Sequence, residues 1–506
     1  MSSSTPHRSS QRDRFSQVLY AEWARFRAVR GWALAMAASV LVTVSLGLLI
    51  AGSARSTCVT GKGEGPCPAP LVGPDGTAVR DKYYFVHQPL QGNGSITARV
   101  SDLTGQVRLP DAVPGVRNVK EGVVPWAKAG LLVRQSLKQG TPYAAVMLTG
   151  AHGVRMQYNY THDLPGGPHN GPQWLRLTRS GDTITGYESD EGQTWTEVGT
   201  VKLTGLPDTV QIGLFVTSPG ALWDMAQAFA QATATFDRIT LRGADGSWRG
   251  DDVGVVMESD GETPHHPGGV VESGDKLIVT GGGDIGPASV EGGIRADLTL
   301  IGGAVGLIPV LVAAVTFFRR GLDSMAGPHP VRRLAAQAAV IGAVAFVAGL
   351  VASGAVVPAG LALLRAHQNP VQPITLGTES RVIVGYAALT TAAAVLALSL
   401  AALVRRGIVA VGLGLALVVV PYLLVSAGMA PWLLVITPAA GFAITQSVPA
   451  FSHVDVGPSL IEGYYPLPPW AGLGVAFGYA ALALGAAMAV HRRTPGSRSA
   501  NHQENA

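Results

Sequence analysis

Charged residues are scarce in this sequence. Asp, Glu, Lys and Arg make up 14% of its 506 residues, whereas soluble proteins carry about 25%. Hydrophobic residues account for 47%. The longest apolar runs lie after residue 297, while Gly, Pro, Thr and Asp dominate the stretch 53–297. This division indicates two parts that fold in different solvents, one of them a membrane.

The common motifs for catalysis and for nucleic-acid binding are also missing. No G-x-x-x-x-G-K-[ST] loop occurs, so the chain cannot hydrolyse ATP by a P-loop mechanism. The G-x-S-x-G and H-E-x-x-H patterns are absent as well. The net charge is +4, and the arginines flank apolar runs instead of forming a basic patch with interleaved aromatics. The sequence predicts no enzyme, no cofactor or metal site, and no nucleic-acid partner.

Cysteine is nearly absent, and Cys58 and Cys67 are the only two. They close a short segment that contains Gly and Pro. A disulfide between them is expected if this segment lies in an oxidising compartment, with free thiols as the alternative. A metal site is not expected, because two Cys with no neighbouring His supply too few ligands.

Six apolar segments are long enough to cross a membrane as helices, since a hydrocarbon core about 30 Å thick needs roughly 20 residues. They lie at 32–51, 298–318, 334–361, 382–404, 408–430 and 470–490. None of them, as bounded here, contains a charged residue or His. Ion-coupled carriers usually need such groups, so a carrier of that kind ranks third among the functions considered.

Arginines mark the orientation of these segments. They precede the first segment and lie between the second and third, between the fourth and fifth, and after the sixth. The positive-inside rule therefore places 1–31 and 491–506 in the cytoplasm, 298–490 mainly within the plasma membrane, and 52–296 outside the cell. The first segment is interpreted as a retained anchor, because its leader is long and no clean A-x-A cleavage site follows it.

Short segments of alternating polarity recur between turn signals in the outer region. The alternation is clearest at Val154, Met156, Tyr158 and Tyr160, and the turn 190–192 is predicted to join two strands of a hairpin. Many short strands at this spacing predict an all-β antiparallel sandwich or barrel. We expect it over 82–242, followed by a Gly- and Asp-rich extension over 245–296.

One stretch of the outer region resembles a known family. The run 174–195, with 129–134 before it and 236–239 after it, is similar to the concanavalin/laminin-G-type jelly roll over about 82–242. Its Ser-x-Asp-Gly-x-x-Trp element is present, with Glu191 in place of the Asp. Such domains often bind glycans, and the resemblance implies stacking of sugar rings on Tyr158, Tyr160, Trp174 and Trp195, with core packing as the alternative.

The membrane part resembles type-2 ABC exporter permeases. The basic, amphipathic stretch 20–32 is similar to their connecting helix, and 431–446 with 465–470 is similar to their non-cytoplasmic hairpin and re-entry. The resemblance implies an exporter permease that works with a separate ABC-type ATPase subunit, which binds the ATP. It also implies a homodimer or heterodimer of permeases.

Contact with the ATPase is expected from six residues of this part: Glu22, Trp23, Arg25, Arg27, Arg319 and Arg320. For the first four of these residues, a positive-inside flank with an interfacial Trp is the alternative interpretation. Membrane lipid is an expected partner, and the outer domain is expected to contact substrate, a glycan or the cell envelope. The alternative function is a membrane-tethered glycan-binding or sensing protein without transport activity.

Overall fold

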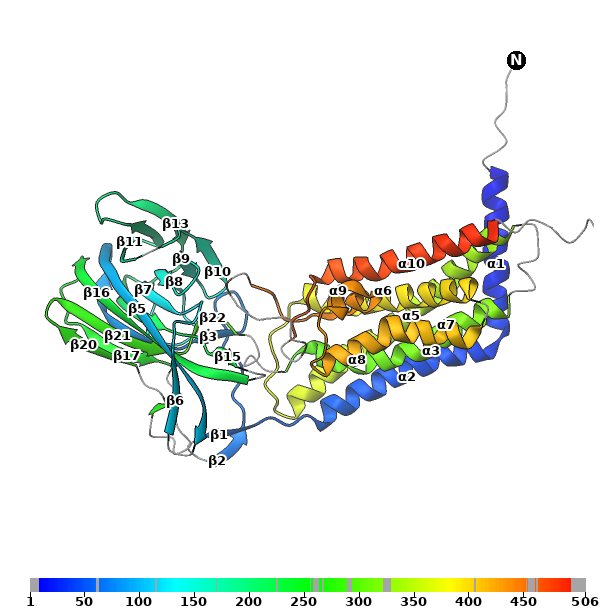
Figure 1. Cartoon of the computed structure of the whole chain (residues 1–506), viewed down its shortest axis with the longest axis horizontal. Helices are drawn as coiled ribbons and strands as arrows, with labels where there is room; N and C mark the ends of the chain where they lie inside the picture. The colour runs from blue at the N-terminus through cyan, green and yellow to red at the C-terminus, as the bar shows by residue number, and fades with distance from the viewer. Residues whose placement is uncertain are drawn as a thin grey trace, which may run out of the picture. The chain divides into compact units, whose positions relative to one another are not determined.

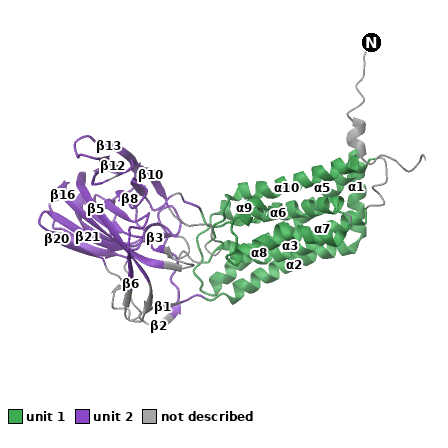
Figure 2. Ribbon diagram, in the orientation of Figure 1, with its two compact units in different colours: residues 1–55, 294–449, 456–506 green, residues 56–293, 450–455 purple. Residues whose placement is uncertain are grey.

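The chain folds into a helical unit and a β-rich unit in the computed structural model (Figure 1). Unit 1 comprises residues 1–55, 294–449 and 456–506, and unit 2 comprises 56–293 with 450–455 (Figure 2). The residues described are 9–60, 63–113, 116–169, 171–223, 226–254, 256–257, 264–265, 268–288, 294–321, 329–404, 406–451, 453, 460 and 463–492.

The helical unit is built from long apolar helices and a few short ones. Its elements are α1 (Ser9–Ala28), α2 (Arg30–Ser53), η2 (Ala296–Leu300), α3 (Gly302–Arg319), α5 (Pro330–Ala366), α6 (Leu376–Leu403), α7 (Gly407–Gly414), η3 (Leu415–Val419), α8 (Val420–Ser426), α9 (Leu433–Ile436), η4 (Pro438–Thr445) and α10 (Pro469–Arg492). In the described part of the chain, six helical stretches are long and apolar enough to cross a membrane. They are Arg30–Ser53, Ala296–Arg319, Pro330–Ala366, Leu376–Leu403, Gly407–Ser426 and Pro469–Arg492. The six predicted segments are thus confirmed as long apolar helices.

Small and hydroxyl-bearing residues bring these helices close together. At the α2–α3 contact, a Cβ on Gly306 would come within 2.0 Å of the Thr43 hydroxyl, so only glycine fits there. The Ser39 hydroxyl donates to the Gly306 carbonyl at 2.6 Å. At the α5–α6 contact the Thr390 hydroxyl donates to the Ala345 carbonyl at 3.0 Å. Such close approach is how helices associate where apolar burial gives little driving force.

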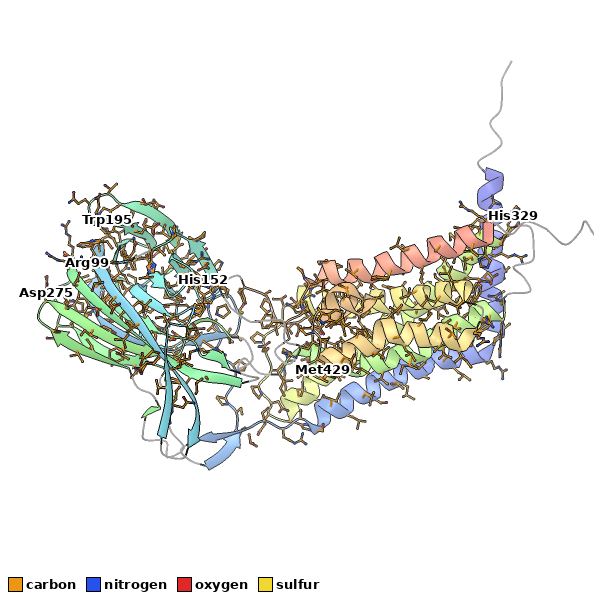
Figure 3. The ribbon with its side chains drawn as sticks, viewed as in Figure 1. Arg99, His152, Trp195, Asp275, His329 and Met429 are labelled. Atoms are coloured by element: carbon orange, nitrogen blue, oxygen red, sulfur yellow. The ribbon has the colours of Figure 1, made fainter. Side chains whose placement is uncertain are left out.

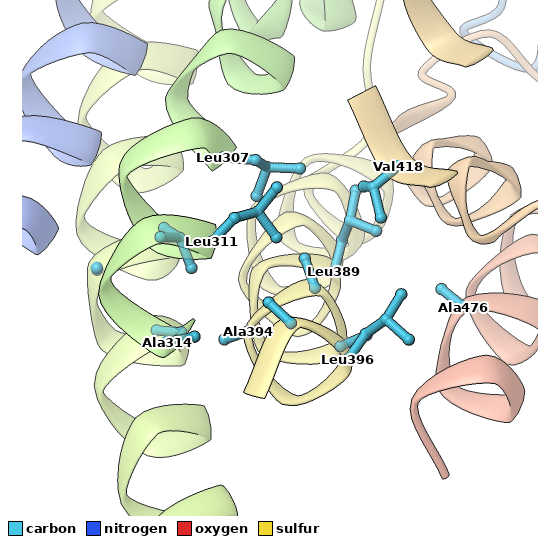
Figure 4. Close-up of a cluster of buried hydrophobic side chains, with 14 of the residues drawn as sticks. Leu307, Leu311, Ala314, Leu389, Ala394, Leu396, Val418 and Ala476 are labelled. Carbon is cyan, nitrogen blue, oxygen red and sulfur yellow. The ribbon is translucent and has the colours of Figure 1, made fainter. Parts of the chain in front are cut away.

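Large apolar side chains fill the remaining space inside the bundle. Leu307 and Leu311 of α3, Leu389 of α6 and Val418 of η3 belong to one buried cluster (Figure 4). All four are at most 1% exposed. The cluster extends over every span-length helix, so the helices form one bundle around a shared core.

The β-rich unit contains two large antiparallel sheets. Its strands are β1 (Thr57–Thr60), β2 (Gly63–Pro66), β3 (Val79–Asp81), β4 (Tyr83–Gln91), β5 (Gly94–Val113), β6 (Val116–Glu121), β7 (Lys128–Arg134), β8 (Tyr143–Thr149), β9 (Val154–Tyr158), β10 (His162–Pro165), β11 (Gln173–Ser180), β12 (Thr183–Ser189), β13 (Thr196–Lys202), β14 (Thr209–Thr217), β15 (Ala221–Trp223), β16 (Ala226–Arg242), β17 (Arg249–Val253), β18 (Val256–Met257), β19 (Pro264–His265), β20 (Gly269–Ser273), β21 (Lys276–Gly282) and β22 (Ile285–Pro287). One sheet has the order β10-β9-β8-β7-β14-β4-β17. The other runs β13-β12-β11-β5-β16-β21-β20, with β6 and β15 beside it.

Alternation along the strands places one face of each sheet in a common core. In β11, Leu175 and Leu177 are fully buried, and they share a cluster with Leu131 of β7 in the other sheet. The side chains between them, such as Arg176, are only half-buried. The sheets therefore pack as a sandwich, which confirms the predicted antiparallel β architecture; the jelly-roll assignment stays a prediction.

The sandwich extends beyond the end predicted from the sequence. β17 pairs with β4 in one sheet, and β21 pairs with β16 in the other. Part of the predicted extension 245–296 is therefore integral to the sheets. The Gly- and Asp-rich composition of this segment did not indicate these strands, because strand pairing depends on neighbours that are distant in the sequence.

A buried ion pair joins strands β7 and β3. Arg134 is 0% and Asp81 1% exposed, and the guanidinium Nη2 is 2.9 Å from the carboxylate Oδ2. The carboxylate also accepts from the Gly140 backbone N–H at 2.9 Å and from the Tyr160 hydroxyl at 2.8 Å. Arg134 donates to the Tyr83 hydroxyl as well. These bonds compensate the desolvation of both charges and join β3, β4, β7 and two loops.

The β-rich unit includes a short segment, 450–455, from the connection between η4 and α10. His453 in this segment is 4% exposed, and its Nε2 donates to the Tyr160 carbonyl at 3.0 Å. Its ring lies 6.3 Å from that of Trp126, in an edge-on arrangement. Burial lowers the pKa of His453 from its usual 6.5. The hydrogen bond to the Tyr160 carbonyl and the carboxylates of Asp163 and Asp284 oppose this shift, and Lys128 adds to it. The imidazole is therefore held neutral.

Acid is expected to weaken the attachment of this segment. As the pH falls below 6.5, the unfolded chain binds a proton that the folded state takes up only at lower pH, so stability decreases with falling pH. Between about pH 7.5 and 5.5, the melting temperature of the original full-length protein should fall by about 2–4 °C more than the melting temperature of the His453→Gln variant. Equal pH dependence of the two proteins would contradict this assignment.

Candidate functional site

The leader helix α1 is held to the bundle by a stripe of buried and half-buried residues. Leu19, Glu22 and Phe26 follow the i, i+3, i+7 spacing of one helix face, and Glu22 and Phe26 are each 5% exposed. The Phe26 ring lies 6.0 Å from that of Trp32 on α2 and 5.7 Å from that of Phe317 on α3. This aromatic cluster fixes α1 to the ends of two span-length helices.

A polar network lies beside the aromatic cluster. The Arg25 guanidinium is 2.8 Å from the Glu22 carboxylate and also donates to the Phe317 carbonyl at 3.3 Å. The Gln337 amide of α5 donates to Glu22 at 3.5 Å. Burial raises the pKa of Glu22, and burial together with repulsion from Arg333 lowers the pKa of Arg25. The network therefore connects α1 to both α3 and α5.

Five of the six predicted ATPase contacts divide into two groups. Glu22 is buried and Arg25 is half-buried, and both belong to the network that holds α1 in place. Trp23 is 40% exposed, and Arg27 and Arg320 are exposed. Arg319 is half-buried. The first group has a positioning role, and the exposed residues are the ones a partner can reach.

A small cavity lined by both polar and apolar side chains lies at the opposite end of α3. It has a volume of about 270 Å³, and its polar lining residues are Arg295, Asp297, Tyr422, Ser426 and Tyr465. Arg295 Nε lies 3.1 Å from Asp297 Oδ1, and these residues are 7% and 8% exposed. Asp297 stands in the first turn of η2, where a negative charge is favourable. Leu298, Ile301, Leu423 and Leu460 form the apolar walls.

The connection between α9 and α10 completes this end of the bundle. The Ser447 hydroxyl donates to Asp297 at 3.2 Å, and Arg295 donates to the Leu460 carbonyl at 2.9 Å. Arg381 donates to the Ile444 carbonyl at 2.8 Å and to the Gln446 carbonyl at 2.6 Å. The predicted hairpin segment 431–446 thus supplies both carbonyls that Arg381 contacts. Ser447 and Leu460, which contact Asp297 and Arg295, lie between the two predicted segments 431–446 and 465–470.

Sequence reasoning missed these charged residues because the predicted segments begin at 298 and 382. The helical stretches begin at Ala296 and Leu376, so they include Asp297 and Arg381. A charge next to an apolar run was taken as its boundary, yet each of these charges is compensated by contacts that come from other parts of the chain. No local signal reveals such partners.

The predicted glycan-stacking residues lie in different places. Tyr160 is fully buried, with its hydroxyl bonded to Asp81, so no sugar ring can stack on it and that prediction is corrected. Tyr158 is on β9 in one sheet and stacks on His162 at 4.3 Å. Trp174 is on β11 in the other sheet, and Trp195 precedes β13. Only the two tryptophans share a neighbourhood.

Arginines accompany both tryptophans. The Arg176 guanidinium lies 3.8 Å from the centroid of the Trp195 ring, and Arg99 lies 6.0 Å from that of Trp174 (Figure 3 labels Arg99 and Trp195). Arg99 also binds Asp237 through two bonds of 2.7 and 2.9 Å, which lower the pKa of that carboxyl. Four of these five side chains are half-buried, and the fifth, Asp237, is 2% exposed.

The predicted disulfide is not tested by the structure. The hairpin β1–β2 places the Cys58 backbone opposite Gly65, and Cys67 follows β2. The side chain of Cys58 lies outside the residues whose side chains are described. The Cys58–Cys67 bond therefore stays a prediction.

No protein-family model matches the sequence, and no curated protein matches it either. Several solved structures are similar to part of the chain. A functionally unknown protein from Saccharomyces cerevisiae is 14% identical, with 36% of this chain and 85% of that chain covered and a TM-score of 0.22. The GH43 protein BlXynB from Bacillus licheniformis is 16% identical over 30% of this chain and 28% of its own length, with a TM-score of 0.21. Neither similarity supports an inference about activity.

Proposed function

We propose that this chain is the permease subunit of an ATP-driven exporter of the type-2 ABC class, with ATP bound and hydrolysed by a separate subunit. The observation that carries the proposal is the attachment of α1. This leader helix is fixed to α2 and α3 by Phe26 and to α5 by Glu22, so a force applied to α1 reaches three span-length helices. The exposed residues Trp23, Arg27 and Arg320 offer a surface for the ATPase.

The proposed topology follows the arginine distribution. Both termini and α1 lie in the cytoplasm of a plasma-membrane protein, the six span-length helices cross the membrane, and the β sandwich, of jelly-roll type, lies outside. A second set of six helices, from a homodimer or heterodimer partner, completes the pathway. The substrate moves outward by alternating access, and the sandwich guides it or contacts the cell envelope.

The cavity at Arg295 and Asp297 is the proposed substrate-contact site. It lies at the outer end of the span-length helices in this topology, and it combines a buried ion pair with two tyrosines and apolar walls. Buried charges within membrane helices are costly and are therefore expected to serve binding or transport. Its small volume fits part of a substrate, not a whole polymer chain.

Purification of the tagged full chain in mild detergent tests this proposal. We expect a P-loop ATPase to be recovered in stoichiometric amounts. A Trp23→Ala/Arg27→Ala/Arg320→Ala variant should recover at least about tenfold less, because interface hot spots of this kind contribute more than 1 kcal/mol each. Arg492→Ala, which removes an exposed charge at the end of α10, is the matched control and should change nothing.

A tethered glycan-binding protein is the second candidate, favoured by the outward pairing of Trp174 and Trp195 with Arg99 and Arg176. Aromatic rings beside hydrogen-bond donors suit sugar rings. Recovery of the chain alone, under conditions that keep a known transporter intact, would contradict the permease proposal. Glycan binding that is lost in Trp174→Ala would then support the second candidate.

A further inference from the structure

A second cavity, of about 450 Å³, lies between α1 and the beginning of α5. Its charged lining residues are Glu22, Arg25, His329, Arg332 and Arg333, and every lining residue belongs to the helical unit. Three guanidinium groups thus face one carboxylate. Among the described residues that line the cavity, Glu22 is the only acid.

Glu22 cannot neutralise all of these charges. Its carboxylate already pairs with Arg25 at 2.8 Å and accepts from Gln337 at 3.5 Å. Within the described part of the chain, Nε and Nη1 of Arg25 are buried with no hydrogen-bond acceptor. Glu22 Oε2 and Gln337 Oε1 are likewise buried without a hydrogen bond there, so these buried atoms do not by themselves indicate a ligand. The cavity lining leaves Arg332 and Arg333 without a second acid, and this excess of positive charge favours an external anion.

The beginning of α5 adds to the positive potential. Arg332 and Arg333 stand in the first turn of this 37-residue helix, where no acidic residue occurs and His329 provides no side-chain cap. The first backbone N–H groups of a helix and its dipole attract anions. The guanidinium cluster and the helix terminus therefore act on the same space.

We propose that this cavity binds a phosphate-type anion, held by the guanidinium groups of Arg25, Arg332 and Arg333. Arginine forms paired hydrogen bonds with the oxygens of phosphate, which suits a cavity with several guanidinium groups. Two sources share this chemistry: the phosphodiester head group of an anionic membrane lipid, and free inorganic phosphate. The proposal does not depend on the proposed transport function, because it rests only on the charged residues that line this cavity.

The test uses the full chain in two settings. In lipid nanodiscs, the melting temperature is compared between phosphatidylcholine alone and an equimolar mixture with phosphatidylglycerol. In detergent, sodium phosphate is compared with sodium chloride at equal ionic strength, so that general screening is matched. Bound lipid is counted by native mass spectrometry in the same preparations.

The expected result is a higher melting temperature with one of the two anion sources. Arg332→Ala/Arg333→Ala should bind that source at least about tenfold more weakly, because paired hydrogen bonds to charged groups contribute about 1.5–3 kcal/mol each. The matched control, Arg406→Ala, removes an exposed arginine outside the cavity and should bind as the original protein does. If the alanine variant fails to fold, Arg332→Lys/Arg333→Lys keeps the charge and should still bind more weakly.

The nanodisc and detergent experiments together identify the source of the anion. A shift with phosphatidylglycerol but not with phosphate assigns the site to a lipid head group, and the reverse assigns it to the free anion. The absence of both shifts, or equal binding by the original protein and both double variants, would overturn the proposal. ATPase recovery is measured separately, so either result leaves the permease test independent.

Discussion

Replacing Arg134 with Met is expected to lower the free energy of unfolding of the β-rich unit by about 3–5 kcal/mol, because it leaves the Asp81 carboxylate buried without its counter-charge. Asp81 is 1% exposed and would keep only the Gly140 and Tyr160 donors. In a thermal unfolding experiment on the full chain, the transition of this unit should move down by about 10 °C.

The pair is tested further by a double variant. Asp81→Asn/Arg134→Met removes both charges and should be more stable than Arg134→Met alone, since no unpaired charge remains. Glu191→Gln removes an exposed carboxylate on a turn and should shift the transition by less than about 1 °C. A single variant that unfolds like this control would show that the ion pair contributes little to the fold.

Removing one partner of the Arg295–Asp297 pair is expected to have a similarly large effect on the helical unit. Arg295→Met leaves Asp297 with the Ser447 hydroxyl but without its counter-charge at a site that is 8% exposed. An unpaired charge among apolar helices costs about 3 kcal/mol or more. The melting temperature of the full chain in detergent should fall, and the ATPase activity of the co-purified complex should fall at least about tenfold.

A second variant separates stability from function. Arg295→Met/Asp297→Leu replaces the ion pair with apolar side chains and should recover most of the melting temperature. If the pair contacts substrate, the ATPase activity of this double variant stays low. Recovery of both quantities would mean that the pair serves only the fold. Arg365→Ala removes an exposed arginine at the end of α5 and is the matched control.

Much of the architecture follows from local patterns in the sequence. An apolar run of about 20 residues has to form a helix in a membrane because its backbone polar groups find no other partners. Each of the six runs is indeed a long helix. Alternation of the kind seen at Val154 and Met156 places successive side chains on opposite faces of a strand, and these residues do lie in β9 with their side chains buried.

The candidate sites could be predicted less well from local sequence patterns. The leader helix was singled out from its basic residues, but the burial of Glu22 depends on Gln337, which is 315 positions away in the sequence. Tyr160 has the same residue type and spacing as Tyr158, yet its backbone has a positive φ of 70° and its ring turns into the core. A period-two pattern does not show where a strand ends, and β9 ends at Tyr158.

The sequence by itself determined which segments are apolar enough to span a membrane and which are strands. It also determined the side of the membrane that the arginines favour for each loop. These properties depend on residues that are near one another in the chain. Only the tertiary structure decided which charges are buried. Asp81 meets Arg134, Asp297 meets Ser447, and Arg25 faces Arg333 through contacts between distant segments. A charge is stable away from water only where such partners converge, and convergence is a property of the fold.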